Sequence, residues 1–215
     1  YEELRQRGIP IVFIHNSYTN FPCPSFVMAD EELAYTMTRM LINAGHTDIA
    51  ALFKGDDEQG HLRYKGYIRA LSEASAAVEE QKIGWFYSNY YGNELLDKTV
   101  ENIMSDFKDF TALVCYNDYV AESVWHYLEK QGLKIYDDVS IVSFDNLMNA
   151  QYIGPGITSA EHPQKLIGIE AAVSLMRMIR EGMNQIPNKK IILQTQICVR
   201  NSIKNIKKNL KEELL

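Results

Sequence analysis

Apolar and polar residues follow one another along the chain in a regular alternation of strand-like and helix-like segments. The short runs "PIVFIH" (10–15), "DIAALF" (48–53) and "TALVCY" (111–116) are apolar and rich in β-branched residues. Such runs predict buried β-strands. Further strands are predicted at 82–87, 139–144 and 189–199.

Between these runs lie segments with helical periodicity. In the segment 30–46, Asp30 can cap a helix N-terminus, Leu33 and Met37 share one face, and Gly45 provides a stop. This combination of cap, apolar stripe and terminal glycine is typical of an amphipathic helix. Further helices are predicted at about 61–75, 93–107, 118–132 and 164–182.

The strands are apolar throughout and are separated by helices, which predicts an α/β fold whose parallel sheets are covered on both faces. After residue 144 the rhythm changes. A turn and a short extended piece (154–163) lead into the long helix 164–182, the strand 189–199 and a charged, helix-prone tail. In parallel sheets the ligand crevice lies beyond the carboxyl ends of the strands. We therefore expect polar residues of functional interest at those ends.

Composition narrows the classes of protein that fit. The 215 residues suffice for one large domain or two small lobes. A net charge of −6 argues against this segment gripping a phosphate backbone, which requires a clustered basic surface. The three cysteines are odd in number and widely spaced, which favours a reducing cytoplasm. We find no signal-peptide pattern and no apolar run near the roughly 18 residues of a spanning helix, so no membrane partner is expected.

Polar clusters do follow the predicted strands. "KGDDEQGHLR" follows the strand 48–53, "YND" follows "ALVC", and "DN" follows "IVSF". "HNSY" follows "PIVFI", and "EHP" follows the extended "ITSA". Asp and Asn also cap helices, and that alternative stays open for Asp118. Because several clusters converge on one sheet edge, we predict a ligand site there.

The chemistry of these clusters excludes several kinds of site. Three acidic residues in "KGDDEQG" disfavour a phosphate ligand. Asp56 and Asp57 lack companion ligands at metal-binding spacing, and no cofactor motif is present. There is no G-x-S-x-G elbow, and Cys115 fits better as a packed apolar residue than as a nucleophile. What remains is a neutral ligand rich in hydroxyl groups, which carboxylates, amides and cationic side chains bind well. Phe144 could cover its apolar face.

Several motifs together resemble one known family. They are "GIPIVFIH", "LINAGHTDIAALFKG", "RYKGYIRAL", "ALVCYNDYVAESVWHYLEKQGLKIYDDVSIVSFDN" and "ITSAEHP". These segments are similar to the effector-binding domain of lactose/galactose-type repressors, whose fold also resembles periplasmic sugar-binding proteins. The resemblance runs from about residue 8 to 203. Within the family, "FK-x-DD-x-QG", "CYND" and "S-x-x-HP" most resemble the arabinose-type subgroup.

The resemblance implies a set of ligand contacts. Arg63 matches an arginine that bonds sugar hydroxyls, Asn117 matches the asparagine of the N-D turn, and Asp145 matches the aspartate after "VSIV". His15 stands where relatives place a polar contact, often Asp or Asn. His162 could face the ligand, or could be a packing or capping residue of the hinge. The remaining implied contacts are Lys54, Asp57 and Gln59 in the subgroup-specific loop, and Asp118 beside Asn117.

The resemblance also implies two lobes joined by three crossings. The N-terminal lobe would comprise 1–29 and 157–188, the C-terminal lobe 30–156 and 189–203, and the charged tail 204–215. The family's first β-α units precede the segment seen here, so the N-terminal lobe is expected to be incomplete in this chain. An incomplete sheet under the helix 164–182 predicts an N-terminal lobe of low stability. "SFDN" in place of the usual "GYDD" leaves the role of Asn146 open.

The function implied by the resemblance is that of a sensor rather than an enzyme. A pentose, with L-arabinose as the first choice, would bind between the lobes of a homodimeric repressor. Binding would release operator DNA, which is held by a domain outside this chain. The alternatives are a solute-binding protein of a sugar transporter, and a hydrolase that uses Asp57 and Asp145 as a carboxylate pair.

Overall fold

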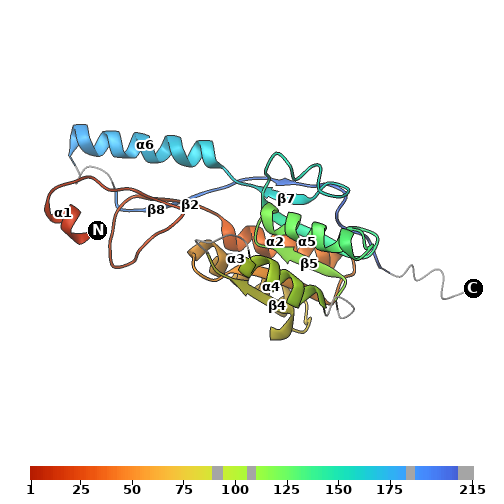
Figure 1. Cartoon of the computed structure of the whole chain (residues 1–215). Coiled ribbons are helices and arrows are strands. Elements are labelled where there is room, and N and C mark those ends of the chain that lie inside the picture. The colour runs from red at the N-terminus through yellow and green to blue at the C-terminus, as the bar shows by residue number, and fades with distance from the viewer. Residues whose placement is uncertain (89–93, 106–109, 183–186, 208–215) are drawn as a thin grey trace, which may run out of the picture. The chain divides into compact units, whose positions relative to one another are not determined.

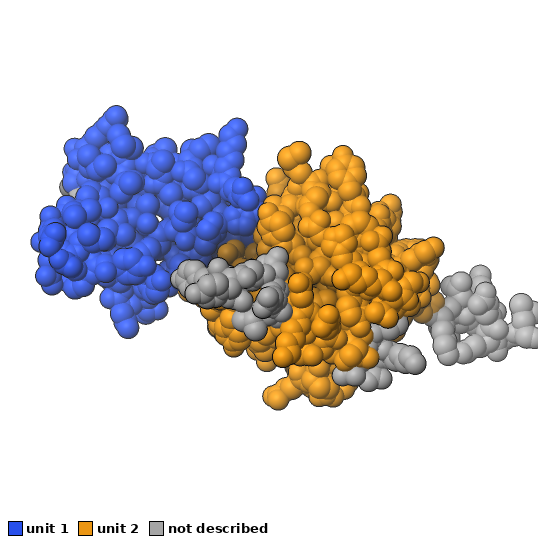
Figure 2. Space-filling view, viewed as in Figure 1, with its two compact units in different colours: residues 1–29, 162–195 blue, residues 30–161, 196–215 orange. Residues whose placement is uncertain are grey.

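The computed structural model describes residues 1–88, 94–105, 110–182 and 187–207, and the chain divides into two compact units (Figure 1, Figure 2). The small unit comprises residues 1–29 and 162–195, and the large unit comprises 30–161 and 196–215. The first division lies after Ala29. The second lies after Glu161 instead of residue 156, and the third after Thr195 instead of residue 188.

Strand pairing explains both shifts. Residues 158–161 pair in parallel with 142–145 and so extend the sheet of the large unit. Residues 190–193 pair with 25–28 in the small unit. The single strand predicted at 189–199 is therefore wrong: it is two strands, which belong to different sheets.

The large unit contains a six-stranded sheet in the order β4-β3-β5-β6-β7-β9, parallel except for β9. Helices α2 and α3 pack together on one face, and α4 and α5 on the other (Figure 1). The strands are β3 (Ile49–Lys54), β4 (Ile83–Phe86), β5 (Ala112–Cys115), β6 (Ser140–Asp145), β7 (Thr158–Glu161) and β9 (Ile197–Cys198). The helices are α2 (Asp30–Asn43), α3 (Glu58–Glu73), the 3-10 turn η1 (Glu80–Lys82), α4 (Glu94–Ser105) and α5 (Asp118–Lys130).

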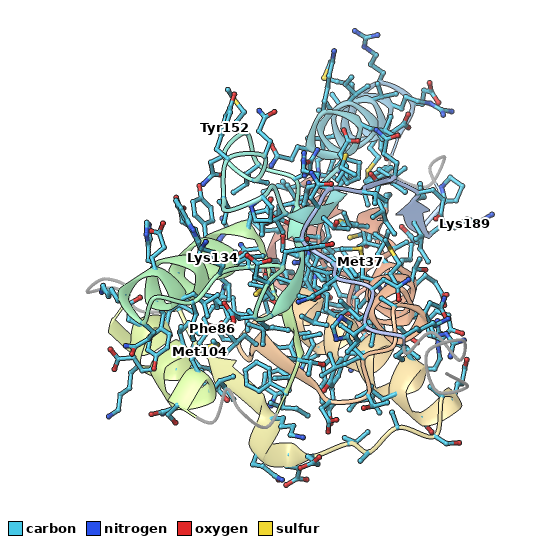
Figure 3. The ribbon with its side chains drawn as sticks, turned by 90° about the vertical axis from the view of Figure 1, so that its right-hand side faces the viewer. Met37, Phe86, Met104, Lys134, Tyr152 and Lys189 are labelled. Carbon is cyan, nitrogen blue, oxygen red and sulfur yellow. The ribbon has the colours of Figure 1, made fainter. Side chains whose placement is uncertain are left out.

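The central strands are buried on both faces because their sequences are apolar on both faces. All four residues of β5 are fully buried, and β3 is buried from Ile49 to Phe53. Met37 of α2 and Phe86 of β4 lie in the interior, whereas Tyr152 projects outward from the loop after β6 (Figure 3). The prediction of a doubly covered parallel sheet is confirmed.

Helices α2 and α3 approach closely at Gly66. A Cβ atom there would lie 2.1 Å from the carbonyl oxygen of Glu31, so only glycine fits at this crossing. The next residue, Tyr67, is buried and donates its hydroxyl to the carbonyl of Ile49 at 2.6 Å. The two residues thus fix α3 against both α2 and β3, and thereby fix the position of Arg63 one turn earlier.

The small unit contains a three-stranded parallel sheet in the order β1-β2-β8, with α6 packed on β1 and β2. Its elements are α1 (Glu2–Gln6), β1 (Phe13–Ile14), β2 (Ser25–Met28), α6 (Gln164–Glu181) and β8 (Lys190–Leu193). Sequence patterns missed β2. Its four residues are all buried, so they show no alternation, and the run is too short to stand out beside the helix at Asp30.

The tail departs from its helix-prone appearance where it is described. Residues 203–207 form no helix, and Ile206 donates its amide to the carbonyl of Ala44. Residues 208–215 lie outside the described part. Among the helices that the structure describes, none is long and apolar enough to cross a membrane.

Candidate functional site

The topology of the large unit creates a switch point between β3 and β5. From β3 the chain moves outward to β4, and from β5 it moves in the opposite direction to β6 and β7. The loops that leave the carboxyl ends of β3 and β5 therefore diverge, and this is where open α/β sheets bind ligands. Most of the predicted site residues lie on the loops and helix starts at this edge.

The loop after β3 brings together one cation and two carboxylates. The Nζ atom of Lys54 lies 3.3 Å from Oδ2 of Asp57 and 3.6 Å from Oδ1 of Asp56. The side chains of Lys54 and Asp57 are about a quarter exposed, at 25% and 26%. Asp57 also caps α3 by accepting the amide of Gly60 at 2.7 Å. This cap explains why α3 begins three residues before the predicted start at 61.

Gly60 is required at the first turn of α3. A Cβ atom at this position would lie 1.9 Å from the carbonyl oxygen of Lys54, a distance that no side chain can occupy. The close approach lets the loop fold back so that Lys54 and Asp57 face each other. Gly55, the earlier glycine of the motif, lies against the ring of Tyr87, an exposed side chain that can move aside, so this position is less restricted.

Arg63 lies behind this loop and is almost fully buried, with 1% of its side chain exposed. Its Nε donates to Oδ1 of Asp30 at 2.8 Å, Nη1 donates to the carbonyl of Tyr116, and Nη2 lies 3.5 Å from Oδ1 of Asp145. The guanidinium lies 4.7 Å from the ring centroid of Tyr116 and 4.3 Å from that of Phe144. Arg63 thus links α2, β5 and β6 to the start of α3.

This environment changes the expectation for Arg63. The sequence suggested a ligand contact on the surface of a cleft, whereas the structure holds its guanidinium inside the protein. Burial raises the pKa of the Asp30 carboxyl, and the adjacent Arg63 partly opposes that shift by stabilising the charged form. Gln59, also predicted as a contact, is half-buried, and its Nε2 lies 3.5 Å from Oδ1 of Asp30.

Phe144 does not present its ring to the outside. It is 0% exposed and covers the guanidinium of Arg63, so the prediction that it would cover a sugar face is wrong. The residue after it, Asp145, ends β6 with its side chain 18% exposed. Its backbone has φ +90°, and Asn146 has φ +46°. Two successive non-glycine residues in this region indicate a strained turn, a feature that clusters at functional sites.

The sequence left open whether the N-D turn caps a helix or contacts a ligand, and Asn117 and Asp118 differ in this respect. Asn117 is the cap of α5, because its Oδ1 accepts the amide of Val120 at 3.2 Å, and its side chain is half-buried. Asp118 is 0% exposed and accepts hydrogen bonds from Ser143, Ser159 and the amide of Leu147. Burial raises the pKa of Asp118, although these donors oppose the shift. A direct ligand contact by Asp118 is therefore wrong.

The two histidines lie in the small unit. The rings of His15 and His162 meet edge to face with centroids 4.7 Å apart, and both residues are half-buried. His15 has φ +63°, a conformation that residues other than glycine rarely adopt. Their contact with a ligand stays a prediction.

Sequence reasoning missed two residues of this site. Asp30 was noted only as a helix cap, yet it is the buried counter-ion of Arg63. Tyr116 was quoted within "YND" but given no role, yet its hydroxyl donates to Oδ2 of Asp57 at 2.6 Å. The position of Tyr116 directly after β5 could have indicated it. Nothing in the sequence near Asp30 pairs it with a residue 33 positions later.

Other chemistries find little support. The described residues contain no group of three or more His, Cys, Asp or Glu side chains that could hold a metal ion. Cys115 is fully buried, and burial raises the pKa of its thiol, so it is a packed apolar residue.

Comparison with known proteins shows which family this chain resembles. A match to the family of periplasmic binding protein-like domains covers residues 38–203. The arabinose metabolism transcriptional repressor of Geobacillus stearothermophilus is 34% identical over 96% of this chain and 57% of its own length. The HTH-type transcriptional repressor PurR of Vibrio campbellii is 31% identical over 94% of this chain and 59% of its length. The chain thus spans a little over half the length of these relatives.

Solved structures share the fold. A LacI family transcriptional regulator from Enterococcus faecium with bound ribose superposes with a TM-score of 0.81 at 21% identity, covering 96% of this chain and 75% of that one. The transcriptional regulator CelR in complex with cellobiose gives 0.83 at 22% identity, covering 93% and 60%. The family model matches well over half of the chain, which therefore belongs to the family of periplasmic binding protein-like domains.

Proposed function

We propose that this chain is the sugar-sensing domain of a transcriptional repressor, and that its effector is a pentose, with L-arabinose as the first choice. The observation that carries the proposal is the convergence of part-exposed polar side chains on the switch-point edge of the large unit. Lys54, Asp57, Asn117 and Asp145 come from three different strand ends at this edge. Asp145 lies 3.5 Å from the buried Arg63, and Asp57 accepts from Tyr116, whose ring packs on the same guanidinium. Carboxylate, amide and ammonium groups in this arrangement suit adjacent hydroxyl groups.

The network around Arg63 supports a preorganised site. Asp30, Tyr116 and Asp145 hold the guanidinium from three elements, and Tyr116 in turn donates to Asp57. A ligand hydroxyl that accepts from Lys54 or donates to Asp57 or Asp145 would meet groups whose positions are already fixed. Preorganisation of this kind lowers the entropic cost of binding.

The relatives make L-arabinose the first sugar to test. Two arabinose metabolism transcriptional repressors are 34% and 30% identical to this chain. PurR repressors are almost as similar, at 31% for the Vibrio campbellii protein, so the effector class must be tested and not assumed. These relatives are all repressors, which favours the sensor over the solute-binding alternative.

In the proposed mechanism, the full-length repressor is a homodimer that carries a separate DNA-binding domain. Effector binding favours one of two conformations and lowers the affinity for operator DNA. Such coupling equals the differential affinity of the effector for the two states, typically about 1–3 kcal/mol. The acidic net charge of −6 is consistent with DNA contact by another part of the protein.

Isothermal titration of the full-length protein tests the proposal. L-arabinose, D-xylose, D-ribose and D-galactose are titrated in parallel with a nucleobase. We expect one pentose to bind, and Asp145→Asn to weaken that binding strongly, whereas Asp137→Asn, an exposed carboxylate elsewhere in the same unit, leaves it unchanged. Tight binding of the nucleobase with no response to any sugar would overturn the sugar assignment.

A further inference from the structure

The turn after β6 is held by side chains that do not line the proposed site. Asp145 and Asn146 both have positive φ, at +90° and +46°. Such a conformation in two consecutive non-glycine residues persists only where surrounding contacts over-determine it. Because Asp145 is the residue of this turn that faces Arg63, whatever fixes the turn also fixes the position of its carboxylate.

Asp118 holds the turn from the side of α5. Its Oδ2 accepts the amide of Leu147 at 2.7 Å, and its Oδ1 accepts the hydroxyls of Ser143 and Ser159. Ser159 in turn accepts the amide of Asn146 at 3.0 Å. Both backbone amides that follow Asp145 are therefore bound, directly or through one serine, to a carboxylate with no exposed surface.

Arg200 holds the turn from the other side. Its Nη2 donates to Oδ1 of Asn146 at 2.6 Å, and its Nη1 donates to the carbonyl of Ile157 at 2.6 Å. The backbone of Arg200 is fixed as well, because its amide donates to the hydroxyl of Thr158 at 2.9 Å. Arg200 follows β9, shortly after the chain returns from the small unit at Gln196.

We infer that Arg200 and Asp118 are positioning residues of the effector site, which hold the turn 145–147 so that Asp145 is presented beside Arg63. The inference rests on the proposed function, because it takes Asp145 as an effector contact. It also gives Asn146 a role: its side-chain oxygen is the acceptor through which Arg200 acts. Arg200 ties the geometry of the site to the segment that enters the large unit from the small one.

Substitutions at Asn146 can test whether the turn positions Asp145 without disturbing the folding of the large unit. Asn146→Gly removes the acceptor but fits φ +46° without strain, so the large unit should fold at least as well as the wild type. We expect it to bind the preferred sugar, tested first with L-arabinose, about tenfold more weakly. Asn146→Asp keeps an oxygen acceptor for Arg200 and should retain wild-type affinity. Arg200→Gln should match Asn146→Gly.

Met148 provides a matched control in the same loop. Its side chain is 89% exposed, and Met148→Ala should change neither affinity nor unfolding temperature. Equal affinity of Asn146→Gly and wild type for a sugar that the wild type binds would overturn the inference but leave the proposed function intact. Absence of sugar binding by the wild type would instead count against the proposed function.

Hydrogen exchange tests the inference without any ligand. In the wild-type protein the amides of Asn146 and Leu147 should be protected, because both donate to buried acceptors. Arg200→Gln should speed their exchange roughly tenfold, while the amides of β5 stay unchanged. Wild-type amides at 146 and 147 that exchange as fast as an open loop would contradict the inference whatever the effector proves to be.

Discussion

The two units of this chain are built from the same kinds of element but bury very different amounts of apolar surface. In the large unit, residues from four strands and two helices form one core cluster together with loop residues, and most of these residues are below 5% exposed. In the small unit, the described core cluster consists of Phe26, Ile167 and Ala171, with Val12 and Leu193 packed against it. Because apolar burial is the main stabilising term, the large unit should be far more stable.

The small unit exposes many apolar side chains on its surface. Helix α6 buries a single row of residues and leaves most of its other apolar side chains exposed. Strand β8 lies at the edge of the three-stranded sheet and is also apolar and exposed. The exposed apolar residues are Leu166, Ile169, Val173, Met176 and Ile179 on α6, and Ile191 and Ile192 on β8. A helix that is apolar on nearly all sides is one that is normally covered.

The largest expected difference between the units is in local opening. Amides in α6, β2 and β8 should exchange roughly a thousandfold faster than those in β3, β5 and β6. Hydrogen-exchange mass spectrometry of the 215-residue chain measures both sets at once. Limited proteolysis should likewise cut 1–29 and 162–195 first. Equal protection of the two units would contradict the comparison drawn from their cores.

The next largest expected effect is a difference in stability between removing a buried ion pair and removing an exposed one, both of which join α2 and α3. Arg63→Ala leaves Asp30 buried without its partner and should lower the free energy of unfolding of the large unit by about 3 kcal/mol. Arg69 also joins α3 to α2, through Glu31 and Glu32, but its side chain is 34% exposed. Arg69→Ala should cost about 0–1 kcal/mol. Urea unfolding followed by tryptophan fluorescence compares the two variants.

The result for Arg63 also separates two views of that residue. Loss of effector affinity with unchanged unfolding is what a surface ligand contact would give. The buried network predicts that stability falls as well, and that the small unit keeps the exchange rates of the wild type. Unchanged stability of Arg63→Ala would therefore contradict the structural role inferred from its burial.

The smallest effect concerns pH and belongs to the large unit. His46 is buried, with Nδ1 2.8 Å from the Thr111 hydroxyl and Nε2 3.1 Å from the Lys204 carbonyl. Burial lowers its pKa from the ordinary value of 6.5, partly opposed by the hydrogen bond to Lys204. Below pH 6.5 the unfolded chain therefore binds more protons than the folded one, so the contribution of His46 is complete above pH 6.5 and is lost as pH falls.

Unfolding at pH 7.5 and pH 5.5 measures this contribution. The wild-type large unit should lose stability between the two values, and His46→Asn should lose less. An identical pH dependence in the two proteins would mean that other groups dominate.

The layered α/β fold could be predicted from the order of apolar and polar residues, because strands buried on both faces must be apolar throughout, and runs such as 111–116 are. It also located Lys54, Asp57, Asn117 and Asp145 at strand ends, since the carboxyl edge of a parallel sheet collects the loops. Gly66 and Tyr67 lie with Arg63 in the segment "RYKGYIRAL", but nothing in that segment shows what each of them touches.

Which polar residues face outward and which are buried depends on long-range contacts that the structure alone shows. Arg63 and Asp118 carry the same local signals as true surface residues, but contacts from Asp30, Ser159 and other distant positions bury them. Asn146 could not be interpreted until Arg200 was placed against it, 54 positions later. A short stretch of sequence indicates whether it favours a helix or a strand and which positions are apolar. Burial and hydrogen-bond partners depend instead on contacts with residues far away in the sequence, which no short stretch reveals.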